Sequence, residues 1–175
     1  MKNLSALFFL AIVALFVSCD ESSSGSSDEF TGKEIAFDLQ QASDFPISGT
    51  VTFKERTDLT IQVIVELSGT EGNITHPVHL HYGNLTTPDA EIAALLNDLD
   101  ASTGVSETIV DLLSDESKFR FDDLTSFEGS VKVHLSASGD GRNVVLAGGN
   151  IGASLDKSNS GGRINIADIT VCKSE

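Results

Sequence analysis

Four histidines are the residues of this sequence best suited to chemistry. Three of them, His76, His79 and His81, lie in one six-residue stretch, and the fourth, His134, lies in a separate stretch. Imidazole nitrogens are good ligands for copper, zinc and nickel ions. The spacing therefore indicates a metal site that two distant segments of the chain would build together.

Both histidine-bearing stretches alternate polar and apolar residues, as β-strands with one buried face do. Side chains of an extended strand point alternately to opposite faces of the sheet. The apolar residues that alternate with the histidines are Val78, Leu80, Tyr82, Val131, Val133 and Leu135. We expect two strands of one sheet to bury these residues and to carry His79, His81 and His134 on the solvent side. The alternative is that these histidines are ordinary polar residues of half-buried strands and bind nothing.

The N-terminal stretch has the pattern of an export signal over residues 1–18. Lys2 precedes an apolar run, residues 4–17, that is too short to span a bilayer comfortably. The run ends in Phe16-Val17-Ser18-Cys19, which resembles the lipobox of bacterial lipoproteins. That resemblance implies acylation of Cys19. Without such processing the chain would be an ordinary secreted protein with a free Cys19.

The remainder is expected to be one domain on a short tether. Residues 19–29 would comprise the lipidated cysteine and ten acidic, serine and glycine residues, a composition typical of a flexible linker. Residues 30–175 are enough for one domain with a sizeable core. Cys172 would have no intramolecular partner, so no disulfide framework is expected. We predict a membrane-anchored lipoprotein of the bacterial cell envelope, facing the periplasm or the surface.

The charge of the chain restricts its partners. It has 26 acidic residues against 11 lysines and arginines, a formal net charge of −15. Such a chain repels nucleic acid and anionic membrane surfaces and attracts cations. The candidates for a local positive patch near the histidines are Lys132 and Arg142. The sequence does not indicate a protein partner.

Alternating segments separated by turn residues run through most of the chain. The segments expected as strands are 47–55 and 59–67, joined by a hairpin at 56–58, then 76–82, 90–99, 107–113, 119–121, 131–135, 144–155 and a closing strand at 163–171 with a bulge at Ala167-Asp168. The 90–99 segment also has helical propensity, and residues 122–128 would hold one helical turn. Short strands and no long amphipathic helix predict an all-β antiparallel sandwich or barrel.

The order of several short motifs resembles the chordin-type (CHRD) domain of bacterial lipoproteins. Those motifs are Leu67-Ser68-Gly69-Thr70, His76-Pro77-x-His79-x-His81, Asp98-Leu99-Asp100, Thr103-Gly104-x-Ser106, Phe127-Glu128-Gly129, Val131-x-Val133-His134-Leu135-Ser136 and Gly149-Asn150-Ile151-Gly152. They span roughly residues 45 to 155. Both histidine stretches also resemble Cu,Zn superoxide dismutases. Each resemblance implies a Greek-key β-sandwich like that of the dismutases.

The dismutase resemblance also bears on the metal. Proline at 77 cannot donate a ladder hydrogen bond, which places His76 at the entrance of its strand. His76 is then a fourth ligand or, as the resemblance implies, a residue that orients the site through a hydrogen bond. Between His81 and His134 the chain has no histidine and no cysteine. The zinc site and the bridging ligand of the dismutases are therefore absent. Copper is the ion expected for a site in the cell envelope.

Three functions follow from these patterns. The first is copper-like metal binding by His79, His81, His134 and His76 without strong catalysis. The second is dismutase-like catalysis, which needs a metal that changes oxidation state, an open coordination position and delivery of an anion. The third is a protein-binding or structural surface module without metal. A single tyrosine, Tyr82, and no tryptophan give the third little sequence support.

Overall fold

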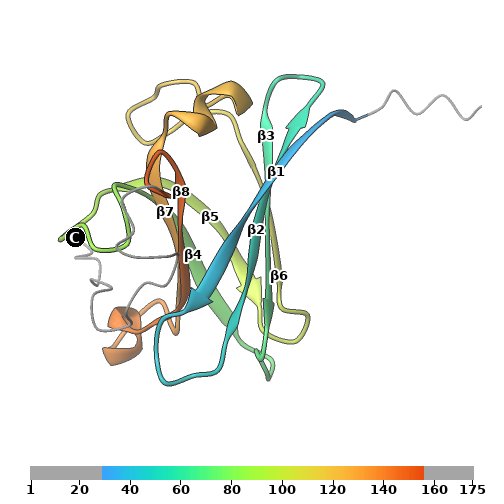
Figure 1. The fold of residues 1–175 in the computed structure, drawn as a ribbon. Coiled ribbons are helices and arrows are strands. Elements are labelled where there is room, and N and C mark those ends of the chain that lie inside the picture. Colours follow the sequence, from blue (N-terminus) through green and yellow to red (C-terminus); the bar gives the residue numbers. More distant parts are fainter. Residues whose placement is uncertain (1–28, 156–175) are drawn as a thin grey trace, which may run out of the picture.

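The computed structural model describes residues 29–155, which form a closed antiparallel β-barrel of eight strands (Figure 1). The expected signal peptide, Cys19, the closing strand at 163–171 and Cys172 lie outside the described residues. Within residues 29–155 no helix is both long and apolar enough to cross a membrane.

Eight strands and two short 3-10 helices make up the described part. Their bounds are β1 Phe30–Gln41, β2 Ser48–Arg56, β3 Ile61–Ser68, β4 Thr75–Tyr82, β5 Ile92–Asp100, β6 Val105–Val110, η1 Phe121–Thr125, β7 Glu128–His134, η2 Asp140–Asn143 and β8 Val145–Gly152. Around the barrel the order is β1-β2-β3-β6-β5-β4-β7-β8, and β8 pairs with β1. Strands β4, β5 and β6 form a meander and β7 returns beside β4, which is a Greek key.

The interior is filled by every second residue of the strands. In β3, Ile61, Val63, Val65 and Leu67 are buried and alternate with more exposed polar and apolar residues. Figure 1 shows the barrel flattened, with β1, β2, β3 and β6 facing β4, β5, β7 and β8 across this core. The expected all-β antiparallel sandwich or barrel is therefore confirmed.

For individual segments, some predictions from the sequence are confirmed and others are wrong. The ambiguous 90–99 segment is a strand, β5, and the helical turn expected at 122–128 is η1, which buries Leu124. The strand expected at 119–121 is wrong, because Phe119 and Arg120 precede η1 outside any strand. Phe119 is instead a buried anchor whose amide donates to the Asp111 carbonyl. Strand β1 was not expected, since only its second half buries side chains.

Candidate metal centre

Strands β4 and β7 lie side by side and place the histidines on the outer face of the barrel. In their ladder His79 pairs with Lys132 and His81 pairs with Ser130. The alternating neighbours Val78 and Leu80 are fully buried in the interior. The face assigned to the histidines from the sequence is therefore the observed one.

His134 is the last residue of β7, and an irregularity in the sheet accompanies it. The β7–β8 register shifts between Val133, which pairs with Ala147, and His134, which pairs with Val145. The extra residue on β8 is Leu146. A bulge of this kind re-aims nearby side chains. Its position is consistent with the His134 ring turning toward the β4 histidines.

Three imidazole rings come together at this point. Ring centroids are 4.9 Å apart for His79 and His134, 5.6 Å for His79 and His81, and 6.5 Å for His81 and His134. One nitrogen from each ring lies within 4.8 Å of the other two. Nitrogens that share one ion at about 2.1 Å lie at most about 4.2 Å apart. Small side-chain rotations therefore suffice to close the three rings on a metal ion.

The centre is not on the solvent side, which corrects the expectation from strand parity. His81 and His134 are 0% and 2% exposed, and only His79 is partly exposed. Residues 83–91, between β4 and β5, lie over this outer face. Their Leu85 is fully buried, and its amide donates to Asn150 Oδ1 on β8. A second layer of packing outside the barrel thus encloses the site.

Backbone carbonyls hold two of the three rings. Nδ1 of His81 lies 3.1 Å from the Ala90 carbonyl oxygen, and Nδ1 of His134 lies 3.0 Å from that of Arg142. A carbonyl only accepts, so Nδ1 carries the hydrogen in each ring and Nε2 carries the lone pair of the neutral imidazole. Nδ1 of His79 is buried and has no hydrogen-bond partner. The hydrogen bonds therefore make Nε2 the candidate ligand atom of His81 and His134, and the buried Nδ1 without a partner the candidate ligand atom of His79.

Burial keeps these rings neutral. It lowers the pKa of His81 to about 4, with the nearby Lys132 charge as the second cause. Burial likewise lowers the pKa of His134 to about 3, followed by the effect of His79. The pKa of His79 is lowered by burial and raised in part by Asp98. Neutral imidazoles bind metal ions without first releasing a proton.

These shifts predict that the metal-free protein loses stability as the pH falls from about 6.5 toward 4. The folded pKa values lie below the unfolded value of 6.5, so the unfolded chain binds more protons in this range and acid favours unfolding. Each such proton contributes up to about 1.4 kcal/mol per pH unit. Urea denaturation at several pH values measures the slope. His81→Gln should reduce it, and an unchanged slope in that variant would contradict the assignment.

His76 occupies a different place from the other three. It is buried, shares strand parity with Val78 and Leu80, and lies outside the three-ring group. Its Nδ1–H donates to the carbonyl of Leu135 at 3.0 Å, and Leu135 directly follows His134. This contact joins the entrance of β4 to the end of β7. The geometry matches a positioning role better than a fourth ligand.

Sequence reasoning missed the elements that cover and fix the centre. Ala90 and Arg142 act through backbone carbonyls, which every residue has, so no residue type marked them. Lys132 was expected in a surface patch with Arg142, but its side chain is fully buried while Arg142 is exposed. Alternation did place Lys132 on the face of the histidines, which was the available signal.

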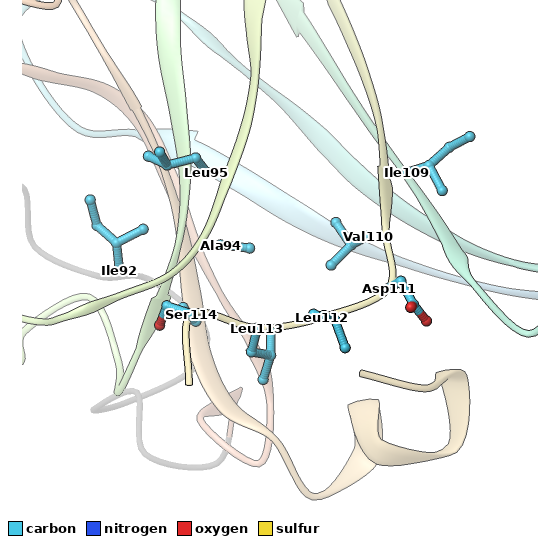
Figure 2. A pocket seen from close by; sticks show the side chains of 10 residues that line it. Ile92, Ala94, Leu95, Ile109, Val110, Asp111, Leu112, Leu113 and Ser114 are labelled. Atoms are coloured by element: carbon cyan, nitrogen blue, oxygen red, sulfur yellow. The ribbon is translucent and has the colours of Figure 1, made fainter. Parts of the chain in front are cut away.

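A separate hollow lies between β5 and β6, where the two strands diverge (Figure 2). It has a volume of about 470 Å³ and an apolar lining that includes Ile92, Leu95 and Ile109. Of its lining residues only Asp111 is titratable, so it offers no constellation for catalysis or metal binding.

The chain matches no protein-family model, and a search of curated proteins finds no significant relative. The evidence for a metal centre is therefore the arrangement of the three histidines in this structure.

Proposed function

We propose that this chain is a lipid-anchored cell-envelope protein that binds a copper-like ion through His79, His81 and His134. The observation that carries the proposal is the convergence of three neutral imidazoles whose nitrogens lie within 4.8 Å. Two of the rings are held by backbone carbonyls, as metal-binding histidines usually are. His76 supports the site through Leu135.

The ligand set favours copper among the common ions. All three donors are imidazole nitrogens, and calcium and magnesium require oxygen ligands instead. Nitrogen sites bind Cu(II) more tightly than the other divalent first-row ions. Structural zinc sites usually have four protein ligands, and the group found within residues 29–155 has three.

The enclosure of the site favours binding over catalysis. His81 and His134 are buried on all sides, so an ion has access mainly past the partly exposed His79. Rapid dismutation would need an open coordination position and fast delivery of an anion. A net charge of −15 opposes that delivery. We therefore propose metal holding or transfer as the role, rather than turnover.

The proposed location and family rest on the sequence. Lys2, the apolar run that follows it and Cys19 support an acylated N-terminus. The ordered motifs between residues 45 and 155 support a chordin-type domain, and the Greek-key barrel is compatible with that resemblance.

The test is a copper titration of the metal-free full chain purified in detergent. We expect one Cu(II) per chain, tighter than micromolar, with nitrogen hyperfine structure in the electron paramagnetic resonance spectrum. Binding weaker than micromolar would refute the metal site. Mass spectrometry of the same preparation tests the anchor, because an unmodified Cys19 in protein from a bacterial envelope would refute acylation.

A further inference from the structure

The hollow between β5 and β6 is bordered by large apolar side chains that stay exposed within residues 29–155. Leu95 of β5 is 69% exposed and Ile109 of β6 is 56% exposed, and Leu112 follows β6 on the next loop. Figure 2 shows Leu95 and Ile109 on opposite sides of the opening. Single exposed apolar residues are ordinary, but apolar residues gathered around one hollow mark an interaction site.

The backbone beside the hollow is also open. Within the described part of the chain β5 and β6 pair only at Asp100 and Val105. Further along, the Asn97 amide donates to a side chain of β6 in place of its backbone, and the Asn97 side chain donates to the carbonyl two residues before Ile109. Backbone groups of alternate residues point to the same side of a strand. Those of Leu95 and Ile109 therefore face each other across the opening without a ladder partner.

The sequence contains a segment with the pattern of a strand that could fill this opening. Residues 163–171 lie outside the described residues and include Ile164, Ile166, Ile169 and Val171. The two members of each pair alternate with other residues, and a bulge between the pairs would bring all four to one face. Such a segment offers apolar side chains for the hollow and backbone groups for its open edges.

The chain is long enough to reach the hollow. Strand β8 ends at Gly152 beside the start of β7, and the next strands around the barrel are β4 and β5. The Tyr82 amide at the end of β4 donates to the Glu91 carbonyl just before β5, so the hollow lies at this same end. Three strand positions at about 4.8 Å each amount to roughly 15 Å. Eight residues lead from Leu155 to Arg163 and extend up to about 27 Å.

We propose that residues 163–171 dock as an extended strand in the hollow between β5 and β6 of the same chain. Main-chain hydrogen bonds to the open edges hold the segment, and its apolar face covers Leu95 and Ile109. A segment tethered to the barrel is present at high local concentration, so it competes well against a second copy. The docked strand closes the gap in the barrel wall and withholds the apolar hollow from other proteins.

The test uses a nitroxide spin label on Cys172, which directly follows the segment. The full chain in detergent carries Cys19→Ser, so that Cys172 is its one remaining cysteine. A nearby nitroxide broadens the NMR signals of backbone amides. We expect the amide signals of Leu95 and Ile109 to lose most of their intensity. The signal of Ser48, which pairs with Ser68 at the opposite end of the barrel, should keep its intensity.

Two controls identify the occupant and the contact that holds it. Ile164→Asp combined with Ile166→Asp should restore the signals of Leu95 and Ile109, whereas Asn165→Asp, on the other face of the segment, should leave them broadened. Neither control changes a residue of the barrel. The second control mixes spin-labelled chain with isotope-labelled chain that has no nitroxide, and docking within one chain predicts no broadening in that mixture.

Three outcomes would overturn the proposal. Unchanged signals of Leu95 and Ile109 in the spin-labelled chain would show that the segment does not occupy the hollow. Broadening in the mixture would assign the hollow to a second copy. Restored signals in Asn165→Asp, equal to those of the double isoleucine variant, would show that the apolar face of the segment does not hold it there.

Discussion

Alanine at position 79, 81 or 134 should weaken copper binding by at least about 100-fold. Each substitution, His79→Ala, His81→Ala or His134→Ala, removes one of three converging nitrogen donors from a group that contains no substitute ligand. Loss of a group that merely orients a ligand already costs 10 to 100-fold in metal affinity, so loss of a ligand should cost more. Competition with a chelator of known affinity measures the change. Parent-like affinity in all three variants would show that the site is wrong.

The three variants differ in their effect on the fold, and this decides how they are compared. His81→Ala and His134→Ala each empty a buried site and leave a carbonyl oxygen unpaired, which costs about 1–3 kcal/mol. His79 is partly exposed and its Nδ1 makes no hydrogen bond, so His79→Ala should leave stability nearly unchanged. It is therefore the cleanest test of ligation. Urea denaturation of each variant measures its loss of stability, which can then be separated from the loss of copper affinity.

His76→Gln is the matched control for these variants. Glutamine keeps a polar side chain near the Leu135 carbonyl, while the three-ring group does not include His76. We expect a loss of about tenfold, at the lower end for groups that orient ligands, because the glutamine amide can still donate to the Leu135 carbonyl. A loss as large as that of His79→Ala would instead make His76 a ligand.

Strand alternation was enough to predict which face of the barrel carries the histidines. Val78 and Leu80 had to face the interior if that stretch was a strand, and the parity of His79 and His81 then followed. The number of residues between β4 and β7 did not affect this prediction, because each strand by itself shows the same alternation of apolar and polar residues. What parity could not predict was that this outer face is itself covered.

The covering layer has no periodic signal. Residues 83–91 form a connection whose buried members, Leu85 and Ala90, are separated by two threonines, a proline and an aspartate, without strand or helix spacing. Leu85 packs against Gly148, where a Cβ would lie only 3.0 Å from the leucine side chain. Such contacts depend on the path of a loop in three dimensions. The enclosure, and with it the low pKa values of His81 and His134, therefore required the structure.

Strand β1 shows a similar limit. Its first half, which includes Gly32, Lys33 and Glu34, is largely exposed, and only Phe37 and Leu39 face the core closely. A few apolar residues within a mainly polar segment are not enough to predict a strand. The backbone of β1 is nevertheless needed, because it closes the barrel against β8.

That closure predicts a large effect for Gly149→Ala. A Cβ at Gly149 would lie 2.1 Å from the Asp38 carbonyl oxygen of β1 and 3.1 Å from the Leu39 side chain. Backbone cannot yield as a flexible side chain does, so β1 and β8 must move apart. We expect a loss of about 3 kcal/mol or more in the free energy of unfolding, at the upper end for overpacked sites. Urea denaturation measures it.

Gly32→Ala is the control for Gly149→Ala. A Cβ there meets nothing within 4 Å, and the positive φ of 90° alone should cost about 1–3 kcal/mol. Equal losses in the two variants would mean that close backbone contact does not govern closure. The same comparison reaches the metal centre, because β8 pairs with β7 up to His134. Displacing β8 should therefore weaken copper binding in Gly149→Ala, through the position of His134, while Gly32→Ala, in the exposed first half of β1, keeps the affinity of the parent.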